Sequence, residues 1–190
     1  MASPLANSGD DGLRPPTAVM PALRVHATAL WSSWADEPDP FRHLVIGVTA
    51  AYGLALAGDL DLGLVRLQQV TTLALGRGFE ATVMKARGSI GHVHLLRSEP
   101  GPARALLLDC LSQAEHLGNV PGQLMAHEIL SAVCDALGDA GQASVHRRSA
   151  RQLIQQRNQR CQEARSQIAR DRAALRQAMD GMDREWAAPA

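Results

Sequence analysis

Residues 134–143 read CDALGDAGQA, and residues 53–63 read GLALAGDLDLG. In both stretches a Gly-Asp pair interrupts an apolar run, at Gly58-Asp59 and at Gly138-Asp139, which are 80 residues apart. Ser98-Glu99 stands midway between the two pairs. A small residue followed by an acid therefore recurs every 40 residues, and this spacing indicates a repeated structural unit.

The segments between these pairs have the composition of helices. Aromatic residues make up only 3% of the chain, and Ala and Leu, the best helix formers, supply most of the apolar content. No stretch alternates apolar and polar residues as a strand would. Glycine suits the left-handed turn that ends a helix, and an acid favours the next helix N-terminus. We therefore expect an all-α fold with helices over 20–35, 41–57, 60–75, 79–97, 102–117, 121–137 and from 142 to about 186.

Small residues repeat with the same period inside these helices. One set lies five residues after the small residue of each turn, and a second set lies seven residues before it. Small side chains at both places let two antiparallel helices approach closely, which predicts a helical solenoid of about three hairpins. An irregular helical bundle is the alternative. The two sets are Gly63, Ala103 and Ala143, and Ala51, Gly91 and Ser131.

This skeleton of small residues resembles that of tetratricopeptide repeats over residues 41–155. The unit is 40 residues rather than the 34 of the standard repeat, and most consensus aromatics are missing. It is more similar to the longer units of bacterial regulators, in which helices end as HLGN (116–119) does here. We expect a disordered tail over 1–18, a repeat domain over 19–155 and a connector helix over 156–187.

The resemblance implies a binding surface. In tetratricopeptide arrays the first helix of each hairpin lines a concave face. Carried over to this chain, that face would bind a protein or peptide, because it mixes charged and apolar side chains. The alternative is that these residues are simply exposed. The candidate groove residues are Tyr52, Lys85, His92, Glu128 and Asp135.

The last predicted helix carries a line of apolar residues spaced by seven, which is one seam of a coiled coil. The companion seam, three residues further on, holds charges at Arg157, Asp171 and Glu185. We therefore expect a weak homodimer, and the alternative is a solvated helix packed along its own repeats. Residues 147–186 hold ten Arg and five acids. The expected self-association residues are Ile154, Cys161, Ile168, Leu175, Met182 and Trp186.

Several classes of function are disfavoured by composition. The 19 basic and 19 acidic residues balance, which argues against a nucleic-acid or membrane partner. The longest uncharged run, 44–58, is shorter than the roughly 20 residues that span a bilayer. Three widely spaced cysteines suit a reducing cytoplasm. We expect no metal, because His92 and His94 are two residues apart and point to different helix faces. We also expect no cofactor and no enzymatic activity.

The expected function is a non-enzymatic interaction module in bacterial signalling. A second resemblance supports an alternative: residues 144–175 are similar to the connector between tetratricopeptide-like sensor regions and GGDEF-type diguanylate cyclase domains. That connector pairs two chains and passes a signal to the cyclase. No cyclase sequence follows the helix before Ala190. The expectation is therefore either a free-standing adaptor or the sensor region of a diguanylate cyclase without its catalytic domain.

Overall fold

The computed structural model of the chain describes residues 15–186, without the side chains of residues 178 and 180–186. Every regular element in that range is a helix, so the predicted all-α fold is confirmed. Most of the expected tail, residues 1–14, lies outside the described range. The elements are a short 3-10 helix η1 (Thr17–Val19), α1 (Met20–Trp34), α2 (Pro40–Leu56), α3 (Leu60–Gly76), α4 (Glu80–Leu96), α5 (Pro100–His116), α6 (Val120–Ala136) and α7 (Ala140–Trp186).

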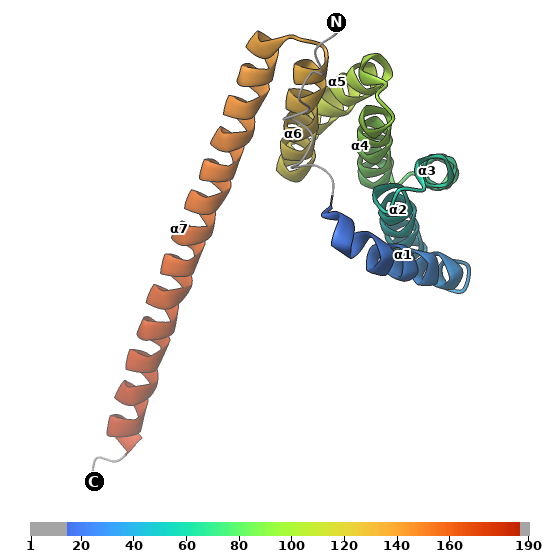
Figure 1. Cartoon of the computed structure of the whole chain (residues 1–190). Coiled ribbons are helices and arrows are strands. Elements are labelled where there is room, and N and C mark those ends of the chain that lie inside the picture. Colours follow the sequence, from blue (N-terminus) through green and yellow to red (C-terminus); the bar gives the residue numbers. More distant parts are fainter. Residues whose placement is uncertain (1–14, 187–190) are drawn as a thin grey trace, which may run out of the picture. The chain divides into compact units, whose positions relative to one another are not determined.

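Consecutive helices from α1 to α6 pack against one another in chain order (Figure 1). Two further contacts join alternate helices, α2 with α4 and α4 with α6. Three hairpins follow from this order: α2 with α3, α4 with α5, and α6 with the first turns of α7. The first helices of the hairpins lie side by side, as a helical repeat solenoid requires.

The turns recur twice as often as we expected. Each of the helices α2 to α6 is 17 residues long. The backbone enters the left-handed region once in every turn, and these residues are 20 apart: Gly58, Gly78, Ser98, Gly118 and Gly138. Ser98, at φ 61°, is the one non-glycine residue of the described chain in that region. A side chain there costs roughly 1–2 kcal/mol.

Side chains close to the turns begin the helices. Asp39, Asn119 and Asp139 each accept a hydrogen bond from the backbone N–H three residues on, which satisfies a donor that the helix leaves unpaired. The fifth helix begins two residues earlier than expected. Pro100 already occupies its first position, because a proline fits where no intrahelical N–H is needed.

The core is built from leucine, valine and alanine. One cluster joins α2, α3 and α4, and includes Leu44, Leu67 and Val93. A second joins α5 and α6 around Leu107 and Leu130. The middle helix α4 is the most deeply placed, with 11 of its 17 residues buried. It therefore fixes the position of both neighbouring hairpins.

The predicted close approach of paired helices is confirmed where α2 meets α3. A Cβ added to Gly63 would lie 2.6 Å from the Cβ of Ala55 and 2.9 Å from the carbonyl oxygen of Ala51. No side chain fits in that space. The glycine therefore sets the separation of the two helices.

Aromatic rings attach α1 to the array. The rings of Trp31 and Trp34 are 4.4 Å apart, and Trp34 lies 4.7 Å from the ring of His43 on α2. The guanidinium of Arg66 on α3 stacks over Trp31 at 4.3 Å. A cation over an indole face is worth about 0.5–1 kcal/mol at a partly exposed site.

The chain divides into two compact units inside α7, between Ala150 and Arg151. In the first unit α7 buries Ala143, His146 and Ala150, and so completes the third hairpin. In the second unit Leu153 and Ile154 are half-buried, and all residues over 155–177 are exposed.

Candidate functional site

The first helices of the hairpins bring equivalent positions together. The Tyr52 hydroxyl on α2 hydrogen-bonds Nδ1 of His92 on α4, and these residues are 40 apart in sequence. Burial raises the pKa of Tyr52 to about 12. On the next pair of helices Met125 of α6 packs against the bare backbone of Gly88 on α4. The repeat register is thus visible in contacts between side chains.

His92 is not presented on this face, which corrects one of our expectations. It is only 2% exposed, because the Tyr52 ring and the neighbouring helices cover it. Tyr52 itself is half-buried. Both residues therefore hold α2 and α4 together. The aligned small residues identified the helix correctly, but they could not indicate how deep each side chain would lie.

Lys85 and Glu128 are exposed, as expected. Lys85 lies three residues before Gly88, and Glu128 lies three residues after Met125, so the two charges flank the α4–α6 contact. Within the described chain neither charge belongs to an ion pair. An open surface with two unpaired charges of opposite sign beside a half-buried methionine remains; we call it the α4–α6 face.

Asp135 is exposed but already has a partner. Its carboxylate accepts a 2.6 Å hydrogen bond from the Arg147 guanidinium on α7. Next to this ion pair, Nδ1 of His127 lies 2.9 Å from Nδ1 of His146. One imidazole must donate its proton to the other. Asp135 therefore joins α6 to α7 instead of waiting for a ligand.

The histidine pair makes the third hairpin sensitive to acid. Burial lowers the pKa of His127, and so does His146, while Glu115 opposes them. Burial also lowers the pKa of His146, helped by Arg104. The pair contributes stability above the ordinary pKa of 6.5, and this stability is lost as the pH falls toward the lower folded values.

We therefore predict that thermal stability falls between about pH 7.5 and pH 5.5, and that His146→Gln makes this fall smaller. Glutamine keeps a polar, neutral group beside His127 but cannot be protonated. Melting curves at the two pH values, for the wild type and the variant, measure the effect. An unchanged pH dependence in the variant would contradict the assignment.

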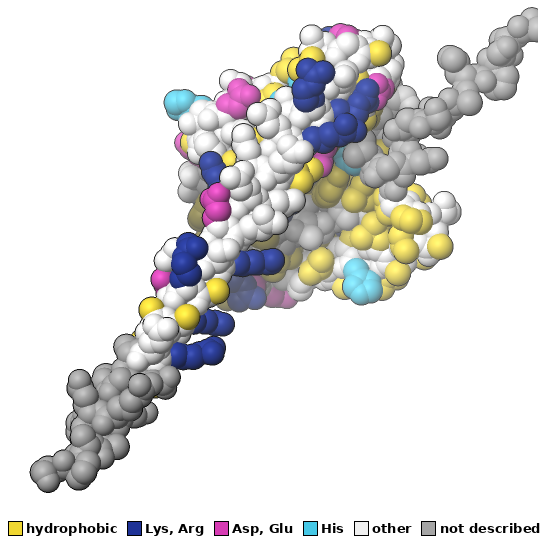
Figure 2. Space-filling model, turned by 90° about the vertical axis from the view of Figure 1, so that its left-hand side faces the viewer, with side chains coloured by type: hydrophobic (Ala, Val, Ile, Leu, Met, Phe, Trp, Pro, Cys, Tyr) yellow, Lys and Arg dark blue, Asp and Glu magenta, His cyan; other side chains and the backbone are white. Residues whose placement is uncertain are grey.

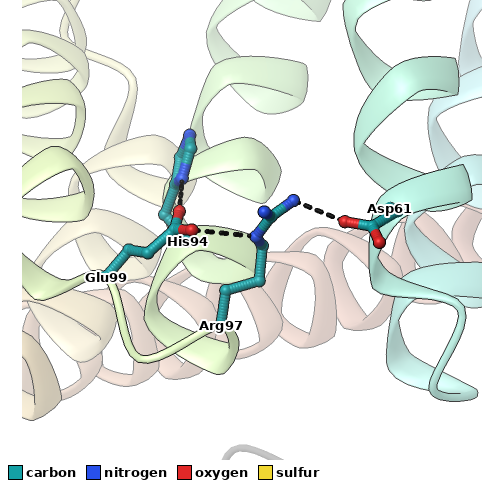
Figure 3. A network of polar contacts seen from close by, with 4 residues as sticks. All are labelled: Asp61, His94, Arg97 and Glu99. Carbon is teal, nitrogen blue, oxygen red and sulfur yellow. Dashed lines mark hydrogen bonds and ion pairs between the residues drawn. The ribbon is translucent and has the colours of Figure 1, made fainter.

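A polar network ties the α4–α5 turn to α3 (Figure 3). The Arg97 guanidinium donates to Asp61 at 2.6 Å and to Glu99 at 3.0 Å, and Glu99 also bonds Nδ1 of His94 at 2.7 Å. The hydrogen bond from His94 is the main cause that lowers the pKa of Glu99, followed by Arg97. The network fixes the turn that carries the strained Ser98.

Sequence reasoning missed an open cavity of about 530 Å³ where the end of α3, the start of α4 and the end of α5 meet. Its apolar lining includes Leu75, Phe79 and Leu117, and its polar lining includes Arg87, which is paired with Asp109 at 3.1 Å. The separation of α3 from α5 is a tertiary property. No local pattern in the sequence could have indicated it.

Two of the three cysteines are core residues. Cys110 and Cys134 are each 1% exposed, and burial is the main cause that raises the pKa of both thiols, that of Cys110 to about 11. Cys161 is exposed on α7. Only this thiol is accessible to reagents without unfolding.

The seven-residue line of the second unit is open along most of its length. Ile154 is half-buried, Cys161 is exposed, and Ile168 and Leu175 are 53% and 64% exposed. The side chains of Met182 and Trp186 lie outside the described residues. The line is therefore an apolar surface without a cover among the side chains that the structure describes in the second unit.

Two searches of the described residues have negative results. No three His, Cys, Asp or Glu side chains within residues 15–186 gather closely enough to hold a metal ion. No helix in the same range is long and apolar enough to span a bilayer.

Comparisons with protein-family models, with curated proteins and with solved structures found no match. The interpretation of the surfaces described above therefore depends on their geometry and charge.

Proposed function

We propose that this chain is a non-enzymatic interaction module, which binds a peptide or helix of another protein on the α4–α6 face. One observation carries the proposal: Lys85 and Glu128 are exposed, opposite in charge and without ion-pair partners, and they flank the contact of Met125 with Gly88. Charges beside an apolar contact select a partner by complementarity. The unpaired cysteines suit a reducing cytoplasm, and the tetratricopeptide resemblance suits a bacterial signalling protein.

A random peptide library displayed on phage and selected on the intact chain tests this proposal. We expect enriched peptides to combine an acid, a base and at least one apolar residue. The exchange of Lys85→Glu with Glu128→Lys keeps the net charge and should weaken these peptides about tenfold, which is ~1.4 kcal/mol. Fluorescence anisotropy with labelled peptides measures the loss.

A matched exchange serves as the control. Arg77→Glu with Glu80→Lys makes the same change of charge at the α3–α4 turn, away from the α4–α6 face. It should leave peptide binding unchanged. Melting temperatures near that of the wild type exclude unfolding as the cause. Selected peptides that bind the Lys85/Glu128 exchange as well as they bind the wild type would overturn the proposal.

We also propose that α7 pairs weakly with a second copy through its seven-residue line. Cys161 lies on that line, so a parallel pair in register would place two copies of this thiol face to face. Because Cys110 and Cys134 are buried, the other thiols are shielded from an oxidant.

Mild oxidation should therefore yield a disulfide-linked dimer that increases with protein concentration. Cys161→Ser should abolish the dimer entirely. Ile168→Asp with Leu175→Asp should abolish it as well, because two more charges enter the seam, while the repeats stay folded. Non-reducing gel electrophoresis and light scattering give the yield and the mass. A monomer at every concentration would refute the pairing.

A further inference from the structure

The second unit carries an excess of positive charge that nothing in it neutralises. Between residues 151 and 176 there are seven arginines and two acids, and every one of these side chains is exposed. Among the described residues, none of the seven arginines forms an ion pair. The acids are instead hydrogen-bonded to glutamines, Glu163 to Gln159 and Asp171 to Gln167. Figure 2 shows the dark blue side chains along the described part of α7.

The positive charge and the apolar line share one side of the helix. Arg165 and Arg172 each follow a residue of the line by four, which places them one turn further along the same side. Arg165, Arg172 and Arg176 outline an open surface with Ile168 at its edge. A partner that covers the apolar line must therefore also face these guanidinium groups.

A second copy of the chain satisfies this requirement poorly. In a parallel pair Arg157 would face its own copy across the companion seam, and so would Asp171. Arg160 would approach the partner copy's Arg165, since flanking positions five residues apart meet in such a pair. Each of these encounters brings like charges together. Self-association through this surface is therefore weak.

A membrane surface also matches it poorly. A helix that lies in the bilayer interface needs a broad apolar face, of at least about 100°. Here the apolar side chains form a single narrow line with a seven-residue spacing, which is the geometry of a helix–helix seam.

We propose that residues 151–176 of α7 dock an acidic amphipathic helix of a different protein. The partner helix would carry apolar residues at its own seam positions, to cover Ile168 and Leu175. It would carry Glu or Asp at its flanking positions, to pair with Arg165 and Arg172. The proposal rests on the proposed function as an interaction module, but it concerns a separate surface from the α4–α6 face.

The test uses the intact chain and a synthetic helix of about four heptads, with Leu at both seam positions and Glu at the flanking positions. A second probe is identical except that Lys replaces each flanking Glu. We expect the Glu probe to bind at least about tenfold more tightly than the Lys probe at low salt. Binding should weaken between roughly 0.05 M and 0.3 M salt, because screening acts strongly on exposed charges.

Charge reversal gives the sharper result. Arg165→Glu with Arg172→Glu should lose the Glu probe and gain the Lys probe. Arg148→Glu with Arg170→Glu makes the same change of charge on the opposite side of the helix, and it should keep the preference of the wild type. Circular dichroism of each variant shows whether α7 stays helical. The exchange of Lys85 and Glu128 should leave the Glu probe bound, which separates this proposal from the proposed function.

Several results would overturn the proposal. Equal affinity for the two probes would mean that charge does not select the partner. Binding of phosphatidylserine vesicles that the Glu probe does not displace would assign the helix to a membrane. Binding of a DNA duplex in preference to the Glu probe would assign it to nucleic acid. A tight homodimer that excludes the probe would give the surface to a second copy.

Discussion

Gly63→Ala is expected to lower the free energy of unfolding by about 2–3 kcal/mol, even though alanine is the better helix former. The new methyl group would lie 2.6 Å from the Cβ of Ala55 and 2.8 Å from its backbone nitrogen. Because backbone atoms of α2 line this space, α3 can accept the methyl group only by moving away. Such a movement would open the contacts of Leu67 and Val70 in the first core cluster.

Gly76→Ala is the matched control, since it makes the same change in the same helix. A Cβ there would have no neighbour within 4 Å, and the backbone is not left-handed. We expect it to be neutral or to stabilise the chain by about 0.5 kcal/mol. Chemical unfolding followed by circular dichroism measures both variants. Equal effects of the two substitutions would contradict the role assigned to Gly63.

Leu107→Ala is expected to cost about 2–5 kcal/mol, the usual range for a large core side chain replaced by alanine. Leu107 is fully buried, and it fills the space beside Gly91 on the neighbouring helix. A Cβ added to Gly91 would lie 2.7 Å from the Leu107 Cγ. Removal of the leucine therefore leaves a cavity in contact with that glycine.

The double variant tests whether this contact is real. Gly91→Ala alone should destabilise the chain by about 1–3 kcal/mol, because its methyl group meets Leu107. Together with Leu107→Ala, the same methyl group should partly fill the cavity. The loss in the double variant should therefore be smaller than the sum of the single losses by about 1 kcal/mol. Additive losses within about 0.5 kcal/mol would contradict the packing described here.

The helices and their turns could be predicted because the signals are local. The pairs at 58–59, 98–99 and 138–139 indicated helix ends through the backbone freedom of glycine and the charge of the following acid. The 20-residue period was missed, because Gly78-Phe79 and Gly118-Asn119 lack that acid. Only the observed backbone angles show that all five turns are alike.

The depth of individual side chains could not be predicted in the same way. His92 and Tyr52 lie on the expected helix sides, but they bond to each other across two helices. That contact depends on how far apart α2 and α4 pack, which small residues elsewhere determine. Likewise, Asp135 has a partner because α7 brings Arg147 beside it. Such pairings arise between segments distant in sequence, and a local pattern does not contain them.

The candidate surfaces differ in how visible they were. The apolar line and the arginine excess of the last helix could be read from spacing and composition alone. The cavity beside Leu75 and Leu117 could not, because it depends on the arrangement of three helices. The exposure of Ile168 and Leu175 is likewise a property of the folded chain.

Hydrogen exchange on the intact chain, followed by mass spectrometry, tests most directly whether packed repeats carry a basic helix open to a partner. Amides of α4 should exchange slowest, since this helix is the most deeply buried. Amides over 151–176 should exchange rapidly in the absence of a partner, because an unpacked helix is only marginally stable. The Glu probe should protect these amides and leave the repeats unchanged. Slow exchange over 151–176 without any partner, or no protection by the probe, would contradict the account.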